Sequence, residues 1–335
     1  MSTSVNVSAF TSYFPPGSLE VLTLVDFVVI YTIISVFGVI ANFINIVVFV
    51  KMGLLDSVNI SLLGLSISDF CFLLLTFLLS ISYYPFWEDA DMNFSVYDLK
   101  VLTVAWPQFY FRRVSNWITA FIMLDRCICI ALPLKVKDIT TPRLAKLILV
   151  LIFGIMALTV SPPYFSASYQ AFWSSKTNRT KIVLVYRDNS SAMEAISSAI
   201  SVVFTIVTFI WAAVCTCILV VSLRSKGRLR KEMTGYIKLD HVSTRDRKII
   251  KMVTLMSIIF IVAFTPDVVI LLFMTVDFRV SPFGQYFDLF LVLNGVSEPM
   301  IAVTASVNIF VYYSMSSKYR EVYKRYFKVR KLCCK

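Results

Sequence analysis

The chain has 335 residues, of which 58% are apolar and only 16% are charged, and its formal net charge is +12. Soluble domains carry about 25% charged residues, so this composition excludes an ordinary soluble protein. The apolar runs are too long, and alternate too little, for the strands of a membrane barrel. The sequence contains no nucleophile elbow, phosphate loop or metal-ligand cluster, and we therefore do not expect an enzyme.

Seven apolar segments are long enough to cross a membrane as helices, which takes about 20 residues each. In chain order they lie at about 27–50, 60–84, 99–132, 145–165, 194–223, 250–276 and 284–313. Only helices and closed barrels satisfy their backbone groups in lipid. The sequence therefore predicts an all-α membrane protein, a seven-transmembrane helix bundle, with a short C-terminal interfacial helix in the basic, aromatic segment that follows the last span.

The basic residues are distributed unevenly between the two sides of the predicted bundle. Most of the 32 lysines and arginines fall in the first, third and fifth connections and the tail, so the N-terminus is expected outside and the C-terminus inside. This distribution indicates a basic face toward anionic membrane lipid and not a nucleic-acid surface. We expect an extracellular segment 1–26, a transmembrane domain 27–313 and a cytoplasmic helix and tail 314–335, in the plasma membrane. Four sequons in outer segments are candidate glycosylation sites: Asn6, Asn93, Asn178 and Asn189.

The third span is apolar but carries a narrow polar face. At about 100° per residue, Gln108, Arg112, Ser115 and Thr119 fall close to the direction of Arg126. Such a face must point into the bundle or into a cavity, because charges in lipid are expensive. Arg113 lies about 100° away from Arg112 and leaves the face, so it needs a partner on a neighbouring span.

Acidic residues occur in other spans at a matching depth. Asp267 and Glu298 lie in the outer halves of the sixth and seventh spans, as Arg112 does in the third, whereas Asp69 lies deeper in the second. The charges could simply neutralise one another, although a buried pair is weak evidence for stability. We favour an outer cavity that holds a polar or zwitterionic ligand. The candidate ligand-binding residues are Gln108, Arg112, Arg113, Asp267 and Glu298.

None of the seven cysteines lies in a predicted outer segment, so this topology excludes an extracellular disulfide. The second outer loop contains "KIVLVYRD", a β-rich run with polar flanks, which predicts a hairpin instead. Cys333 and Cys334 follow the basic, aromatic segment and are candidates for palmitoylation.

Several motifs, in order, resemble those of the rhodopsin-like (class A) G-protein-coupled receptors over about residues 35–328. They are Asn42 in "GVIANFINIVVF", Asp69 in "NISLLGLSISDF", Asp125 and Arg126 in "LDRCICIALPLK", Phe260 and Pro266 in "FIVAFTP", and Asn308 and Tyr312 in "NIFVYY". Departures also occur: Cys127, Phe264 and Ile309 replace the family's tyrosine, tryptophan and proline, and Val101 stands where the outer cysteine is usual. The pattern looks most like divergent invertebrate receptors of chemosensory or neuropeptide type.

The resemblance implies roles for particular residues. Arg126 would pair with Asp125 and, at rest, with Asp246, and would be released when the sixth span swings outward on activation. Asp69, Ser115 and Asn308 match positions that hold a sodium ion in many relatives. The remaining residues of the implied switch are Phe260, Phe264, Pro266, Asn308 and Tyr312.

The implied function is a receptor that binds an extracellular ligand, either a small odorant-like molecule or a short peptide, and activates heterotrimeric G proteins. No cofactor is expected apart from an allosteric sodium ion. The intramembrane charges leave an ion channel or transporter as an alternative. The missing proline and cysteines leave a receptor-like scaffold without signalling as another.

Overall fold

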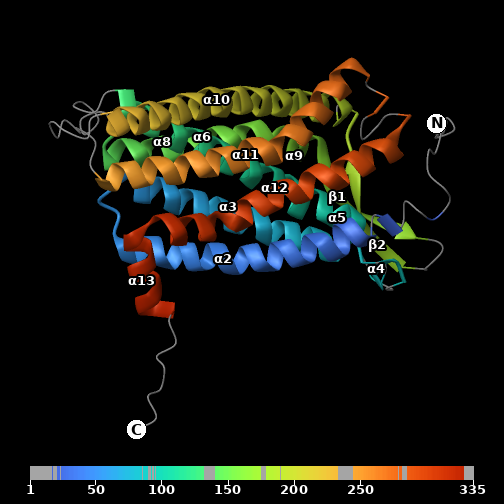
Figure 1. The fold of residues 1–335 in the computed structure, drawn as a ribbon. Coiled ribbons are helices and arrows are strands. Elements are labelled where there is room, and N and C mark those ends of the chain that lie inside the picture. The colour runs from blue at the N-terminus through green and yellow to red at the C-terminus, as the bar shows by residue number, and fades with distance from the viewer. Residues whose placement is uncertain are drawn as a thin grey trace, which may run out of the picture.

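The computed structural model describes residues 17, 21–22, 24–84, 86–89, 92, 94, 96–131, 140–174, 179–188, 190–232, 244–277, 279–280 and 285–327. In these ranges, long helices lie side by side in one bundle (Figure 1). The long helices are α2 (Tyr31–Met52), α3 (Ser57–Ser82), α6 (Trp106–Ala131), α8 (Pro142–Val160), α10 (Ser190–Glu232), α11 (Thr244–Val276) and α12 (Phe287–Met315). The prediction of a seven-helix membrane bundle is confirmed.

Shorter elements extend or connect the long helices. Two π-helices, η1 (Leu24–Ile30) and η2 (Val101–Ala105), lead into α2 and α6, and α5 (Val96–Lys100) precedes η2. The other short helices are α4 (Phe86–Asp89), α9 (Pro162–Ser166) and α13 (Ser317–Phe327), of which α13 is the predicted interfacial helix. It lies at the opposite end of the bundle from the strands β1 and β2 (Figure 1). We call the strand-bearing end the outer end and the α13 end the inner end.

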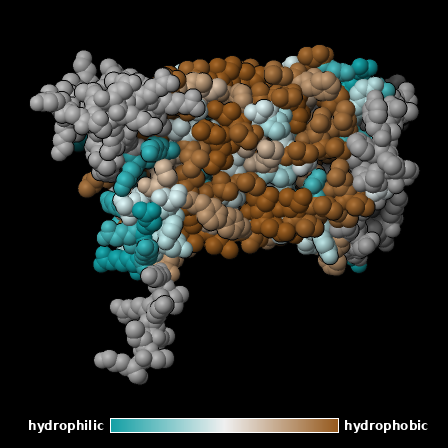
Figure 2. Space-filling model, viewed as in Figure 1, coloured by the Kyte–Doolittle hydropathy of each residue, from teal (hydrophilic) through white to brown (hydrophobic). Residues whose placement is uncertain are grey.

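Six of the helical segments that the structure describes are long and apolar enough to cross a membrane. The seventh, α6, is also long enough, at 26 residues, but contains four charged side chains. Large apolar side chains such as Ile33, Leu158 and Val262 remain exposed on the outside of the bundle. Figure 2 shows a largely apolar surface along the middle of the bundle. This is the surface that a multi-pass membrane protein presents to lipid.

Local sequence signals set several helix ends. Asp56 caps α3 by accepting a hydrogen bond from the backbone N–H of Val58 at 3.3 Å. Thr141 caps α8 in the same way, accepting from the N–H of Leu144 at 3.2 Å. Pro142 follows at the first helical position, where its missing N–H leaves no bond unmade. These caps satisfy N–H groups that would otherwise lack partners at the two helix ends.

Within the described ranges, the departure from the all-α class lies at the outer end. β1 (Ala167–Ser174) and β2 (Arg179–Tyr186) form an antiparallel hairpin whose pairs run from Ala167↔Tyr186 to Ser174↔Arg179. The predicted hairpin of the second outer loop is thus confirmed. β1 was not anticipated as a strand, because its sequence, ASYQAFWS, gives little periodic signal of its own.

Buried polar and aromatic groups join the inner parts of the bundle. Asn42, fully buried in α2, donates to the carbonyl of Ala305 in α12 at 2.9 Å. Tyr319 of α13 is also fully buried, packs on Phe49, and donates its hydroxyl hydrogen to Asn45 Oδ1 at 2.6 Å. The interfacial helix is therefore anchored to α2 by a specific buried contact.

Candidate functional site

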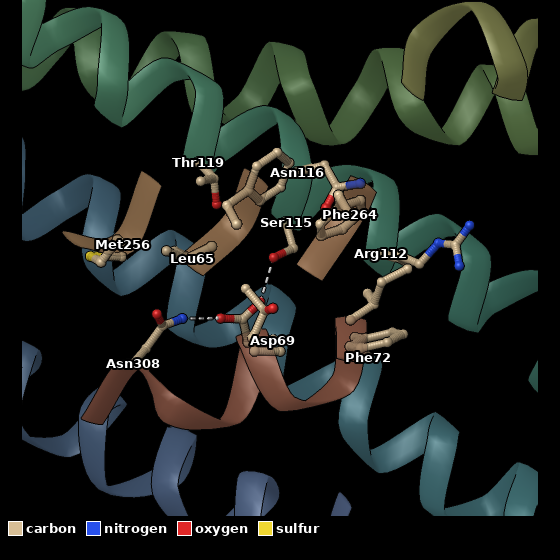
Figure 3. Close-up of a pocket in the computed structure, with 14 residues that line it drawn as sticks. Leu65, Asp69, Phe72, Arg112, Ser115, Asn116, Thr119, Met256, Phe264 and Asn308 are labelled. Carbon is tan, nitrogen blue, oxygen red and sulfur yellow. Dashed lines mark hydrogen bonds between the residues drawn. The ribbon is translucent and has the colours of Figure 1, made fainter. Parts of the chain in front are cut away.

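The polar face of α6 points into the bundle as predicted. Arg112, Ser115, Asn116 and Thr119 line one cavity of about 30 Å³ together with residues of α3, α11 and α12. Figure 3 shows Ser115 pointing toward Asp69, which lies next to Asn308, whereas Arg112 extends away from these two residues. A stripe of this kind on an apolar helix is placed by the 3.6-residue repeat, which returns every third or fourth side chain to the same face.

Three charged residues from three helices meet in the outer half of the bundle. Arg112 of α6 donates from Nη1 to Glu298 of α12, and its Nη2 lies 3.9 Å from Oδ2 of Asp267 in α11. The side chains of Arg112, Asp267 and Glu298 are only 13%, 6% and 15% exposed. We call these three residues the outer charge cluster. Asp267 Oδ2 has no hydrogen-bond partner within the described ranges.

The structure does not bring Gln108 and Arg113 into the outer charge cluster. Gln108 donates to Thr76 Oγ1 of α3 at 3.0 Å, and Arg113 donates to Thr159 Oγ1 of α8 at 3.2 Å. Arg113 thus finds its partner on a neighbouring span, as its helical direction required. Adjacent residues of a helix point about 100° apart, which is why Arg113 faces α8 while Arg112 faces α11 and α12.

Sequence reasoning missed an acidic neighbour of the outer charge cluster. Asp26 of η1 reaches α12 at Gly295, where an added Cβ would lie 2.6 Å from Asp26 Oδ2. Gly295 is one turn from Glu298, so Asp26 brings another carboxylate to this side of the bundle. Its position at the edge of the first apolar run was the available signal, but Asp26 was assigned to the outer segment.

A second group of polar side chains lies deeper, around Asp69. Ser115 donates to Asp69 Oδ1, and Asn308 Nδ2 donates to Asp69 Oδ2 at 3.0 Å (Figure 3). The three residues implied by the resemblance are therefore brought together. Both carboxylate oxygens already accept hydrogen bonds, and Ala305 offers no side-chain oxygen nearby. The residues present therefore fit a carboxylate satisfied by hydrogen-bond donors better than they fit a sodium ion.

The Asp-Arg motif lies at the inner end of α6. Arg126 is 4% exposed and donates from Nε and Nη2 to Oδ2 of Asp125, with an Nε distance of 3.1 Å. It lines a cavity of about 500 Å³ at the inner end, together with residues such as Asn59, Ile249 and Lys318. The side chain of Asp246, the other predicted partner, lies outside the described residues.

Comparison with known proteins decides the family. A family model for the serpentine type 7TM GPCR chemoreceptor Srw matches residues 29–330. The chain belongs to the Srw family. It is also similar to galanin receptor 2b of Danio rerio, with 24% identity over 307 residues that cover 89% of this chain and 74% of that receptor. The predicted G-protein-coupled receptor of divergent type is thus confirmed, and the chain is a signalling receptor, not an enzyme.

The remaining residues of the predicted switch lie on α11 and α12. Phe260 and Phe264 of α11 are both buried and stack with ring centres 4.3 Å apart. Pro266 lies inside α11, two residues further along the helix. Tyr312 is 1% exposed, and its hydroxyl has no hydrogen-bond partner within the described ranges. Its ring packs against Phe49 at 5.1 Å.

Several predicted modification sites of the receptor lie outside the described residues. They are the sequon asparagines Asn6, Asn93, Asn178 and Asn189 and the tail cysteines Cys333 and Cys334. Among the described residues, no group of three or more histidine, cysteine or acidic side chains is placed to hold a metal ion.

Proposed function

We propose that the outer charge cluster binds the extracellular ligand of this Srw receptor. The observation that carries the proposal is the convergence of Arg112, Asp267 and Glu298 from three helices that are distant in sequence. Removing charges from water costs free energy that a buried ion pair does not reliably repay. Ionisable groups within a membrane bundle commonly mark a binding site or a transport path, and the receptor family favours the binding site.

Heterotrimeric G proteins are the proposed partner at the inner end. The inner cavity lined by Arg126 is large enough, at about 500 Å³, for several side chains of a partner. Among the described residues, Arg126 forms an ion pair with Asp125, and its guanidinium would exchange this partner when the cavity changes shape. Ligand binding would shift the population toward the state in which Arg126 faces the G protein.

The proposed topology places the N-terminal segment 1–26 outside, the transmembrane domain 27–313 in the plasma membrane, and the segment 314–335 in the cytoplasm. The bias of lysine and arginine toward the inner connections and the tail supports it. Epitope tags at the two ends of the intact chain, detected with and without permeabilising the cells, test this orientation. Detection of the N-terminal tag only after permeabilisation would contradict it.

A signalling assay in cells that express the receptor with a promiscuous G-protein α-subunit tests the proposed function. Galanin is one probe, because the Danio rerio relative is named as a galanin receptor. Odorant-like compounds and short peptides are the other probes. Arg126→Ala should abolish the response to an active probe at equal surface expression. Arg187→Ala, an exposed arginine of the outer end, is the control and should respond like the parent. An unchanged response of Arg126→Ala would contradict the proposed switch.

A further inference from the structure

We infer that the outer charge cluster selects ligands that carry a positive charge, such as an amine or a guanidine. This inference rests on the proposed function, because it names the chemistry of the ligand for the same site. The chain surrounds Arg112 with two carboxylates and places Asp26 against Gly295, which is one helical turn from Glu298. The single guanidinium of Arg112 cannot neutralise these carboxylates, and the net charge of the group is negative.

Two other described cations near the outer end, Arg113 and Lys100, do not cancel this net negative charge. Arg113 is directed to Thr159 of α8, on another face of α6. The Lys100 ammonium lies 3.5 Å from the centre of the Tyr83 ring, where the aromatic face attracts it. Even if Lys100 is counted with Arg112, the three carboxylates Asp26, Asp267 and Glu298 outnumber these two cations.

Asp267 identifies where a ligand cation would be held. Asp267 as a whole residue is only 4% exposed, and its Oδ2 has no hydrogen-bond donor within the described ranges. Arg112 Nη2 is 3.9 Å away, which is beyond hydrogen-bond distance. A buried acceptor without a donor is unfavourable, so a ligand ammonium or guanidinium that donates to Oδ2 would gain more here than at a satisfied group.

The sign of the electrostatic potential at the outer charge cluster can be measured without knowing the ligand. In Asn294→Cys, the new thiol lies one turn from Glu298, and its rates of reaction with a cationic and an anionic methanethiosulfonate reagent are compared. Val276→Cys, at an exposed position of the outer end of α11, gives the intrinsic ratio, and the parent gives the background of native cysteines. The cationic preference at Asn294→Cys should exceed that at Val276→Cys about tenfold.

Adding Asp267→Asn should lower the cationic preference at Asn294→Cys toward the control ratio. Equal or faster reaction with the anionic reagent, or failure of both reagents to modify the thiol, would overturn the inference. The assay involves no G protein, so a negative signalling assay with a retained cationic preference would overturn only the proposed function.

An independent set of contacts carries a second inference, at the hairpin. We propose that Tyr164 and Tyr169 form a non-covalent latch that holds the β1–β2 hairpin against the start of the third span. Tyr164 donates its hydroxyl hydrogen to the carbonyl of Leu102 at 2.8 Å, and Tyr169 donates to the carbonyl of Leu99 at 2.9 Å. These acceptors lie on either side of Val101, and no cysteine of the chain lies between Cys129 and Cys215 to make a covalent link.

The latch connects the hairpin to the helix that carries Arg112. The two carbonyls belong to α5 and η2, which continue directly into α6, and Arg112 is ten residues beyond Leu102, roughly 15 Å along the helix. A parallel bridge between Phe94 and Ile182 adds a contact between the hairpin and the segment before α5. A tyrosine hydroxyl is protonated at physiological pH, and burial raises the pKa of Tyr169 further, so this group can donate throughout that range.

Hydrogen exchange of the intact receptor, followed by mass spectrometry, tests the latch. In Tyr164→Phe/Tyr169→Phe, amides of Ala167–Tyr186 and of Val101–Ala105 should exchange about tenfold faster, because two hydrogen bonds are lost while both rings remain. The single variants should give smaller increases, and Tyr84→Phe, at an exposed outer position, should give none. Unchanged exchange in the double variant, or an increase spread equally over all helices, would overturn the latch.

Discussion

At the outer end of the bundle, Arg112 lies between two carboxylates from other helices, whereas at the inner end Arg126 donates to Asp125, its neighbour in sequence. The outer arrangement needs three helices in register, and any movement of α11 or α12 changes it. The inner pair travels with α6 alone. A ligand that rearranges the outer charge cluster therefore acts on the packing of three helices, while the inner pair can respond only when the cavity around it changes.

Residues that join helices also differ between the two ends. Near the inner end, Asn42, Asn45 and Tyr319 form buried hydrogen bonds that link α2 with α12 and α13. At the outer end, the hydroxyls of Tyr164 in α9 and Tyr169 in β1 donate to the backbone carbonyls of Leu102 and Leu99. Buried polar networks specify one arrangement, because each unmade bond is costly. We therefore expect ligand binding to rearrange the outer end, whereas the contact of α13 with α2 at the inner end should not change.

The largest expected effect is the removal of Arg112. In Arg112→Ala, Asp267 and Glu298 lose their cation while largely buried, and breaking a buried pair costs about 3–5 kcal/mol. Thermal unfolding of the purified receptor in detergent micelles measures the loss. Arg279→Ala, at an arginine with a 60% exposed side chain, should change stability by less than about 0.5 kcal/mol.

A neutral variant shows whether charge is the cause. Arg112→Met/Asp267→Asn/Glu298→Gln removes all three charges and should recover most of the stability lost in Arg112→Ala. If the triple variant is as unstable as Arg112→Ala, the cluster contributes packing and not electrostatics.

A smaller effect is expected at the inner end. Tyr319→Phe keeps the ring between Phe49 and Tyr312 but leaves Asn45 Oδ1 without its hydroxyl donor, which costs about 1–2 kcal/mol. Limited proteolysis near α13 should accelerate accordingly. Tyr326→Phe, on the same helix with a 50% exposed ring, is the control. Equal proteolysis of the two variants would show that the Tyr319 hydroxyl does not hold α13.

Much of this architecture followed from the sequence because long apolar runs and the helical repeat determine it. The polar face of α6 was predictable, since the spacing of Gln108, Arg112 and Arg126 is a local property. The acceptors Thr76 and Thr159 were not, because a threonine in a span gives no signal until the neighbouring helix is placed. Tyr319 was hidden for a similar reason: in a basic, amphipathic segment, one buried tyrosine looks like the exposed ones around it.

Gly295 gives a prediction of about 1 kcal/mol whose sign depends on its neighbour. In the parent, Gly295→Ala would place a Cβ 2.6 Å from Asp26 Oδ2, so the carboxylate must move, and we expect a small loss of stability. In an Asp26→Ala background the obstacle is absent, and the same substitution should stabilise α12 by up to about 1 kcal/mol, the helix-propensity difference. Additive effects of the two substitutions in thermal unfolding would show that Asp26 does not reach Gly295.

The smallest expected effect concerns sodium and the group around Asp69. Because Ser115 and Asn308 both donate to the Asp69 carboxylate, an ion would have to displace hydrogen bonds that are already made. The adjacent cavity of about 30 Å³ holds no more than one or two waters. Exchanging sodium chloride for choline chloride at equal ionic strength should therefore leave the potency of an active probe unchanged. A several-fold shift in the parent that disappears in Asp69→Asn would show that sodium does compete for this carboxylate. Asp69 would then be a second position that responds to a bound ligand, and sensitivity to ligands would not be confined to the outer end.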